Sequence, residues 1–174
     1  MTTVAMPLPI LGGYPPDDSA GSAAAQLQMT VTSDATDPQA RWPELLFDKD
    51  TDEHWYWGFV MPSNYASDAV LRAYWTSNST AGNVTFGSVL LAQTAGDAVS
   101  IRADKFAATD LNVAGDVSPG VAYYPLYCDI ALTNNDSVAA GDRVVLALYR
   151  DVSDSDDLAV DAIVLDCELR YTAG

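Results

Sequence analysis

A two-residue alternation near the end of the chain constrains the fold more than any other sequence feature. Its apolar members are Ile163, Leu165, Cys167, Leu169 and Tyr171. Charged side chains stand between them, at Asp166, Glu168 and Arg170. Because successive side chains of a β-strand point to opposite faces, the pattern predicts a strand with one apolar and one polar face. Half-buried strands of this kind are typical of antiparallel sheets.

Short β-rich runs recur along the chain between clusters of turn-forming residues. They cover residues 26–32, 42–47, 53–61, 69–76, 83–93, 121–132, 143–151 and 158–171. No amphipathic helix of adequate length separates the runs, which argues against a parallel α/β sheet. About eight strands are the number expected of a double-sheet jelly roll. We therefore predict an all-β fold, an antiparallel double-sheet jelly-roll sandwich.

Two segments depart from the β-rich pattern. Residues 1–25 are rich in Pro, Gly, Ala and Ser and lack a sustained period, so we predict an extended N-terminal arm. Residues 26–174 then form one β-sandwich domain, because the chain has the usual size of a single domain. Small and acidic residues between positions 94 and 120 predict a long connection, with one more short strand near residues 99–102.

The two cysteines fall on apolar faces of predicted strands. In the run 121–132 the shared apolar face consists of Ala122, Tyr124, Leu126, Cys128, Ile130 and Leu132. Cys167 belongs to the apolar face of the closing strand. The first residues lack a basic region and are broken by prolines, so we expect no signal peptide. Both cysteines are therefore predicted to be reduced and buried.

The charge balance excludes one class of partner. The chain has 8 Lys plus Arg against 24 Asp plus Glu, a net charge of −16. Binding to phosphate backbones needs clustered basic side chains, which are too few here. Anionic membranes are disfavoured by the same repulsion, and no apolar run is long enough to span a bilayer. We expect neither nucleic acid nor a membrane as partner.

Catalytic and metal-binding patterns are also missing. His54 is the single histidine, no G-x-S-x-G nucleophile motif occurs, and no glycine-rich phosphate loop or zinc spacing is present. We predict a protein that is not an enzyme and has no cofactor. The alternative is a glycoside-active enzyme that uses two of the many carboxylates, although the spacing selects no pair.

Two acidic clusters raise calcium binding as an alternative. They consist of Asp48, Asp50, Asp52 and Glu53, and of Asp151, Asp154, Asp156 and Asp157. A calcium loop also needs a turn glycine and a terminal glutamate, and neither stands at the required offset. We interpret the clusters as solvated loop acids and predict no metal site.

Aromatic residues crowd one third of the chain: Trp42, Trp55, Tyr56, Trp57, Tyr65, Tyr74 and Trp75. Exposed on a concave face, they would stack on sugar rings, so a carbohydrate-binding module is one alternative. In the run 53–61 both faces are apolar, which predicts a strand covered by the second sheet and by an arm or a neighbouring subunit. We therefore expect a homo-oligomer. The interface candidates are Leu8, Ile10, Leu11, Tyr14, Trp55, Tyr56 and Trp57.

Several segments together resemble a family of small structural proteins of tailed bacteriophages. They are residues 43–47, 55–65, the strand with Trp75, 82–86, 141–144 and 149–158, followed by the closing strand to Tyr171. The resemblance implies a jelly-roll virion protein, commonly a trimer, with no catalytic residues.

On this basis we expect a capsid decoration (cement) protein that is made in the host cytoplasm and docks on the capsid exterior. Its partner would be the major capsid protein or another virion protein. The acidic surface and the arm suit a protein mounted on a shell. The alternative is a tail-fibre, receptor-binding or carbohydrate-binding β-sandwich module.

Overall fold

The computed structural model describes residues 1–17, 23–32, 38–98, 100–106, 111–153 and 155–174. One short 3-10 turn is present in these residues, η1 (Ile10–Gly12), and the rest of the regular structure is strand. The strands are β1 (Thr2–Leu8), β2 (Ala23–Ala24), β3 (Gln26–Val31), β4 (Arg41–Phe47), β5 (Glu53–Val60), β6 (Tyr65–Thr76), β7 (Asn83–Gln93), β8 (Asn112–Val117), β9 (Leu126–Ala131), β10 (Arg143–Arg150) and β11 (Ala162–Ala173). No helix of the described residues has the length and apolarity to cross a membrane.

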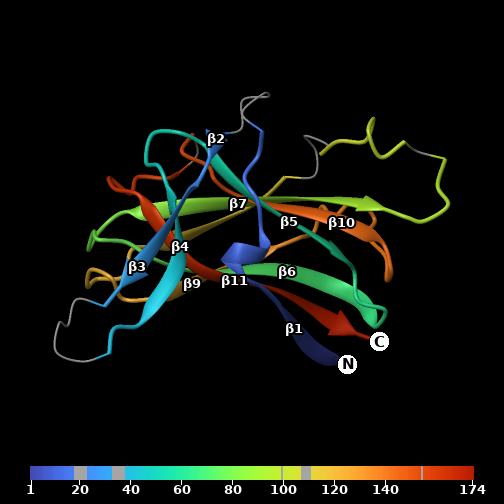
Figure 1. Cartoon of the computed structure of the whole chain (residues 1–174), viewed down its shortest axis with the longest axis horizontal. Coiled ribbons are helices and arrows are strands. Elements are labelled where there is room, and N and C mark those ends of the chain that lie inside the picture. Colours follow the sequence, from blue (N-terminus) through green and yellow to red (C-terminus); the bar gives the residue numbers. More distant parts are fainter. Residues whose placement is uncertain (18–22, 33–37, 99, 107–110, 154) are drawn as a thin grey trace.

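The strands form two sheets that face each other across one core (Figure 1). Sheet A has the order β3-β4-β11-β6-β9, with β1 also paired to β11. Sheet B has the order β2-β5-β10-β7-β8. All pairings are antiparallel except the short parallel contact between β2 and β5. The predicted all-β, antiparallel double-sheet sandwich is confirmed.

Strand β11 is the centre of sheet A. One of its edges pairs with β6 over almost its whole length. Along the other edge, β4 pairs with its first three residues, Ala162 to Val164, and β1 pairs with the stretch from Cys167 to Ala173. The strand that the alternation singled out therefore joins three others.

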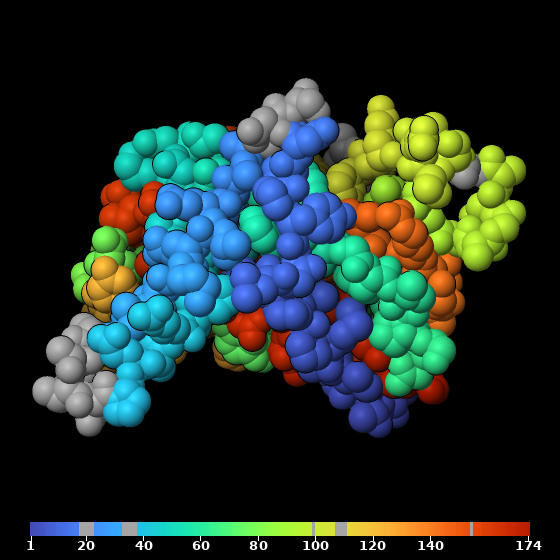
Figure 2. Space-filling model, in the orientation of Figure 1, coloured from blue at the N-terminus to red at the C-terminus, as the bar shows by residue number. Residues whose placement is uncertain are grey.

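The predicted N-terminal arm is extended, and it lies on the sandwich of its own chain. After β1 the Trp57 indole Nε1 donates a hydrogen bond to the Pro9 carbonyl at 3.0 Å. Tyr14 then forms an isolated bridge with Tyr56, and β2 joins the edge of sheet B. The segment thus passes from one sheet to the other, and Figure 2 shows its first residues (dark blue) crossing the front of the molecule.

Four predicted interface residues belong to the core instead. Leu8, Ile10, Trp55 and Trp57 are buried, so they are not available to a neighbouring subunit. The reason is that the N-terminal segment packs onto the sandwich and covers this side of the tryptophans. Leu11 and Tyr14 are exposed and Tyr56 is partly exposed, so an interface role for these three stays a prediction.

The outer face of β5 is covered in part within the chain, from His54 to Tyr56, whereas Val60 at its end is exposed. The Tyr56 ring contacts the Tyr14 ring edge-on and the Phe106 ring at an angle. The His54 ring stacks on Tyr149 with 5.1 Å between ring centroids. Tyr14 of the predicted arm covers part of this face, Phe106 of the long connection covers another part, and a neighbouring subunit stays a prediction.

Two expectations about the middle of the chain were wrong. The run 121–132 forms a strand only from Leu126, since residues 121–125 make a turn, and Tyr124 is exposed rather than buried. Residues 101–103 are also a turn, and the strand of the long connection is β8. Position 99 lies outside the described residues.

Both cysteines are buried, as predicted, and neither is in a disulfide. Burial raises the pKa of the Cys128 thiol to about 12 and lifts that of Cys167 well above its ordinary value. Two thiols that stay protonated and enclosed act as small apolar core residues.

Candidate ligand groove

A hollow lies on the outer face of sheet A, away from the core. It consists of two adjoining parts of about 980 Å³ and 450 Å³. Both parts are lined by Thr30, Trp42, Glu44, Tyr123 and Ile163, so they form one continuous groove. The size of each part lies in or near the range of small-molecule sites in proteins.

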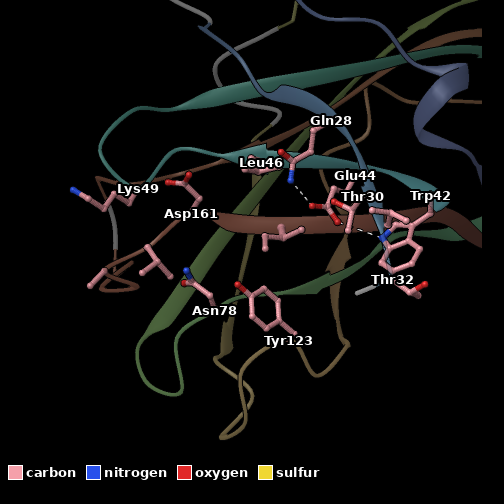
Figure 3. A pocket seen from close by; sticks show the side chains of 14 residues that line it. Gln28, Thr30, Thr32, Trp42, Glu44, Leu46, Lys49, Asn78, Tyr123 and Asp161 are labelled. Atoms are coloured by element: carbon pink, nitrogen blue, oxygen red, sulfur yellow. Dashed lines mark hydrogen bonds between the residues drawn. The ribbon is translucent and has the colours of Figure 1, made fainter. Parts of the chain in front are cut away.

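The hairpin of β3 and β4 supplies one wall of the groove. Gln28 is opposite Glu44 and Thr30 is opposite Trp42 in the antiparallel register. Residues opposite each other in such a pair present their side chains to the same face. All four therefore point to the outer face of sheet A, and Figure 3 shows them gathered on one side of the hollow.

A bulge in β11 supplies the apolar floor. Val164 is paired with Trp75 and Asp166 with Tyr74, which leaves Leu165 as an extra residue. An extra residue shifts the inward and outward alternation of the strand by one. Val164 consequently faces the core together with Cys167, whereas Ile163 and Leu165 line the groove. The prediction that Ile163 and Leu165 share the face of Cys167 was wrong for this reason.

The turn that precedes β9 supplies a second wall. The backbone N–H of Tyr123 donates to the Ser77 carbonyl at 2.8 Å, and the Thr76 hydroxyl donates to the Tyr124 carbonyl at 2.9 Å. Tyr123 has a positive φ of 65°, which turns the chain sharply at this point. Its ring is 64% exposed and borders both parts of the groove. Figure 3 shows Tyr123 and Trp42 on different walls.

A buried carboxylate fixes the polar groups of the first wall. Glu44 accepts a hydrogen bond from the Gln28 amide nitrogen and another from Trp42 Nε1 at 3.3 Å. These two bonds orient the Gln28 amide and the Trp42 ring before any ligand arrives. At the other end of the groove lie Lys49, Asn78 and Asp161 (Figure 3). The Lys49 ammonium is engaged by the Asp50 carboxylate.

The acidic clusters satisfy backbone groups and one arginine. Asp48 accepts from the Asp50 N–H at 2.7 Å, and Asp52 accepts from the Val152 N–H at 2.9 Å. Asp156 is paired with Arg150. Within the described residues no group of three or more His, Cys, Asp or Glu side chains is arranged to hold a metal ion, and Asp154 lies outside them.

The predicted aromatic cluster is divided by the structure. Trp55, Trp57 and Trp75 are buried in the core, and only Trp42 lines the groove. Tyr123, the second aromatic side chain of the groove, was not among the candidate residues.

Comparisons with known proteins give weak structural likenesses. No family model matches the chain, and no curated protein matches it. One similar solved structure is TmCBM61 in complex with β-1,4-galactotriose, with 10% identity, a TM-score of 0.46, and coverage of 94% of this chain and 90% of that one. A second is the family 11 carbohydrate-binding module from Clostridium thermocellum with a mixed-linked tetrasaccharide, with 12% identity, a TM-score of 0.42, and coverage of 95% and 94%.

A third is a two-module structure, CBM22-1 with GH10 of the Clostridium thermocellum xylanase 10B complexed with xylohexaose. Its identity is 10% and its TM-score is 0.47, over 99% of this chain and 28% of that chain. All three contain carbohydrate-binding modules, and none is a phage protein.

Proposed function

We propose that this protein is a non-catalytic, glycan-binding β-sandwich and that the groove on sheet A is its binding site. The observation that carries the proposal is the pair of aromatic rings, Trp42 and Tyr123, on two walls of a groove that also contains fixed amide and carboxylate groups. The proposal takes up the carbohydrate-binding alternative predicted from the aromatic residues, in place of capsid decoration.

A sugar ring needs two kinds of contact, and the groove offers both. Its C–H groups carry partial positive charge and pack on the negative face of an aromatic ring. Its hydroxyl groups both donate and accept hydrogen bonds, which amides and carboxylates reciprocate. Trp42 and Tyr123 supply the first contact, and Gln28, Asn78 and Asp161 supply the second.

The groove is also organised in advance of binding. Glu44 holds the Trp42 ring, and the turn that carries Tyr123 is held by one backbone hydrogen bond and by one from the Thr76 hydroxyl. Side chains that are already ordered lose less conformational entropy when a ligand binds. The fixed geometry of the two walls therefore supports a role of the groove in ligand recognition.

A place on the capsid exterior, contact with the major capsid protein and a trimeric state stay predictions from the sequence. A glycan-binding domain is compatible with either a shell-mounted or a tail-mounted position. Glycan binding by the groove therefore does not depend on where the protein is located.

The experiment that tests the proposal compares two neighbouring tyrosines. An array of oligosaccharides identifies a ligand for the wild type, and calorimetry then measures its dissociation constant. Tyr123→Ala should weaken binding about tenfold, as expected for the loss of an aromatic stacking contact. Tyr124→Ala is the matched control, because Tyr124 is equally exposed, at 62%, and does not line the groove.

Three outcomes would contradict the proposal. The wild type would bind no oligosaccharide on the array, or the two tyrosine variants would lose the same affinity. Shorter sugars released from a bound oligosaccharide would show that the protein is catalytic and would overturn that part of the proposal.

A further inference from the structure

Strand β3 is an edge of sheet A that carries exposed apolar side chains. Leu27, Met29 and Val31 are 43%, 60% and 41% exposed. No other strand of the described residues pairs with the free side of β3. The opposite face of the same strand carries Gln28 and Thr30, which belong to the groove.

The backbone of β3 has a defined set of free hydrogen-bonding groups. In an antiparallel pair, residues alternate between those that bond to the partner strand and those whose N–H and C=O point away from it. Thr32 bonds to Ala40 across the hairpin, and Pro43, opposite Met29, has no N–H to offer. The backbone N–H and C=O groups of the even-numbered residues therefore bond to β4. Those of the odd-numbered residues point away from β4, toward the open edge.

Ala25 supports this assignment. It is odd-numbered, and its N–H donates to the His54 carbonyl of sheet B, away from β4. Leu27, Met29 and Val31 accordingly present three N–H and three C=O groups along the open edge.

The other edges of the sandwich carry the features that block pairing with a further chain. Charged side chains, prolines and very short strands protect an edge, and a glycine weakens the strand that contains it. Strand β1 contains Pro7, β8 contains Gly115 and Asp116, and β9 contains Asp129. Strand β2 has only two residues. Strand β3 has none of these protections, since its sequence is QLQMTV.

The chain around β3 is also free of charge. The chain has a net charge of −16, yet no charged residue occurs between positions 19 and 33. Two copies repel each other over most of their surfaces, and this repulsion is weakest where neither copy carries a charge. The β3 edge is thus a place where charge repulsion does not oppose the approach of two copies of this chain.

We propose that β3 pairs antiparallel with β3 of a second copy about a two-fold axis at Met29. The free groups of the strand are self-complementary in that arrangement, with Met29 opposite its counterpart and Leu27 opposite Val31. A two-fold interface requires such self-complementarity of one surface patch. The result is a dimer, in place of the trimer that the resemblance implied, in which sheet A continues from one subunit into the next and the two grooves lie on one continuous surface.

A cysteine at the axis tests the arrangement directly. Cα atoms of opposed, hydrogen-bonded residues lie about 5.5 Å apart, which is within the range that a disulfide spans. Met29→Cys should therefore form a covalent dimer under mild oxidation, seen on a non-reducing gel. Val60→Cys is the control, because Val60 is as exposed as Met29 and lies on sheet B. The native Cys128 and Cys167 are buried and do not interfere.

A proline variant tests the same edge without a covalent bond. Met29→Pro removes one outward N–H and leaves the bonds to β4 intact, so sedimentation should show a monomer with an unchanged circular dichroism spectrum. Thr30→Pro removes an inward N–H and should instead destabilise the fold.

A wild type that sediments as a monomer at its highest soluble concentration would overturn the proposal. So would Met29→Pro that associates as the wild type does, or Val60→Cys that cross-links as readily as Met29→Cys. None of these readouts depends on a glycan, so the dimer and the groove are tested separately.

Discussion

The Arg150 guanidinium and the Asp156 carboxylate form a buried, two-pronged ion pair between β10 and the loop that follows it. Arg150 Nε and Nη2 donate to the two Asp156 oxygens at 2.8 and 2.7 Å. The remaining N–H groups donate to the carbonyls of Phe47, Leu158 and Val160 at 3.2, 2.8 and 2.9 Å. All five donors of the guanidinium are satisfied, which is what makes its complete burial tolerable.

This pair connects the core to the groove. Phe47 ends β4, which carries Trp42 and Glu44, and Val160 stands beside Asp161 on the groove wall. Asp156 also accepts a hydrogen bond from the Thr85 N–H of β7 at 2.9 Å. Arg150 therefore fixes the loop that forms one end of the groove.

Arg150→Met should lower the free energy of unfolding by about 3–5 kcal/mol, because it leaves the Asp156 carboxylate buried without its cation. Denaturant titration measures the loss. Arg72→Met is the matched control: Arg72 forms a similar two-pronged pair with Asp129 on the open face of sheet A, and its loss should cost about 1 kcal/mol or less. Equal losses for the two variants would contradict the role given to Arg150.

Gly13 allows the N-terminal segment to pass directly over the tryptophans of β5. A Cβ atom at this position would lie 2.1 Å from Trp55 Nε1 and 2.7 Å from the Tyr56 carbonyl oxygen. Neither contact is possible, and the carbonyl belongs to a strand backbone that cannot move aside. The segment must therefore shift if Gly13 gains a side chain.

Gly13→Ala should destabilise the protein by about 1–3 kcal/mol, the usual range for overpacking. It should also make the peptide bonds around residues 9–13 sensitive to limited proteolysis. Intact-mass analysis detects the cleaved products. Gly12→Ala is the control, because its Cβ would meet only the flexible Pro9 ring, at 3.2 Å. If both variants resist protease as the wild type does, the segment is not held by this close approach.

The β-rich runs of the sequence predicted the bounds of two strands closely. The run 83–93 matches β7 in full, and the run 53–61 matches β5 to within one residue. Strand β7 is buried without alternation from Val84 to Leu90, whereas β5 alternates between core and outer residues, as a period of two predicts. The buried cysteines follow from the same rule.

The groove could not be predicted from that rule, because it depends on an exception. Ile163, Leu165 and Cys167 have an unbroken period of two in the sequence, but the extra residue at Leu165 reverses the faces. The bulge is set by the pairing with β6, and the sequence of β11 alone contains no sign of it. Two residues predicted to be core therefore form the groove floor.

Two other differences had a signal in the sequence. Pro125 interrupts the run 121–132, and a proline inside a run is evidence against a strand interior, which would have placed Tyr123 and Tyr124 in a turn. The prolines of the first ten residues were misleading in the other direction, because they counted against a strand where β1 in fact forms. Pro7 is compatible with β1, because β1 is an edge strand and its open side needs no N–H.

The stability of the protein should depend on the protonation of His54, its one histidine. The ring stacks on Tyr149 on the outer face of sheet B, and burial lowers its pKa below the ordinary value. The unfolded chain takes up a proton near pH 6.5, whereas the folded chain does so only at lower pH. Between these two values the unfolded state binds more protons, so acidification favours it.

The contribution of neutral His54 to the free energy of unfolding is therefore complete above about pH 6.5. It is lost as the pH falls through the pKa of His54 in the folded state. Wild type should lose thermal stability over this interval relative to His54→Phe, which keeps a ring against Tyr149 and cannot take up a proton. Burial raises the pKa of the neighbouring Glu53, and this acts in the opposite direction, so the difference between the two proteins is the informative quantity. Melting curves from about pH 7.5 to 5 that run parallel for the two proteins would show that His54 is protonated equally in both states.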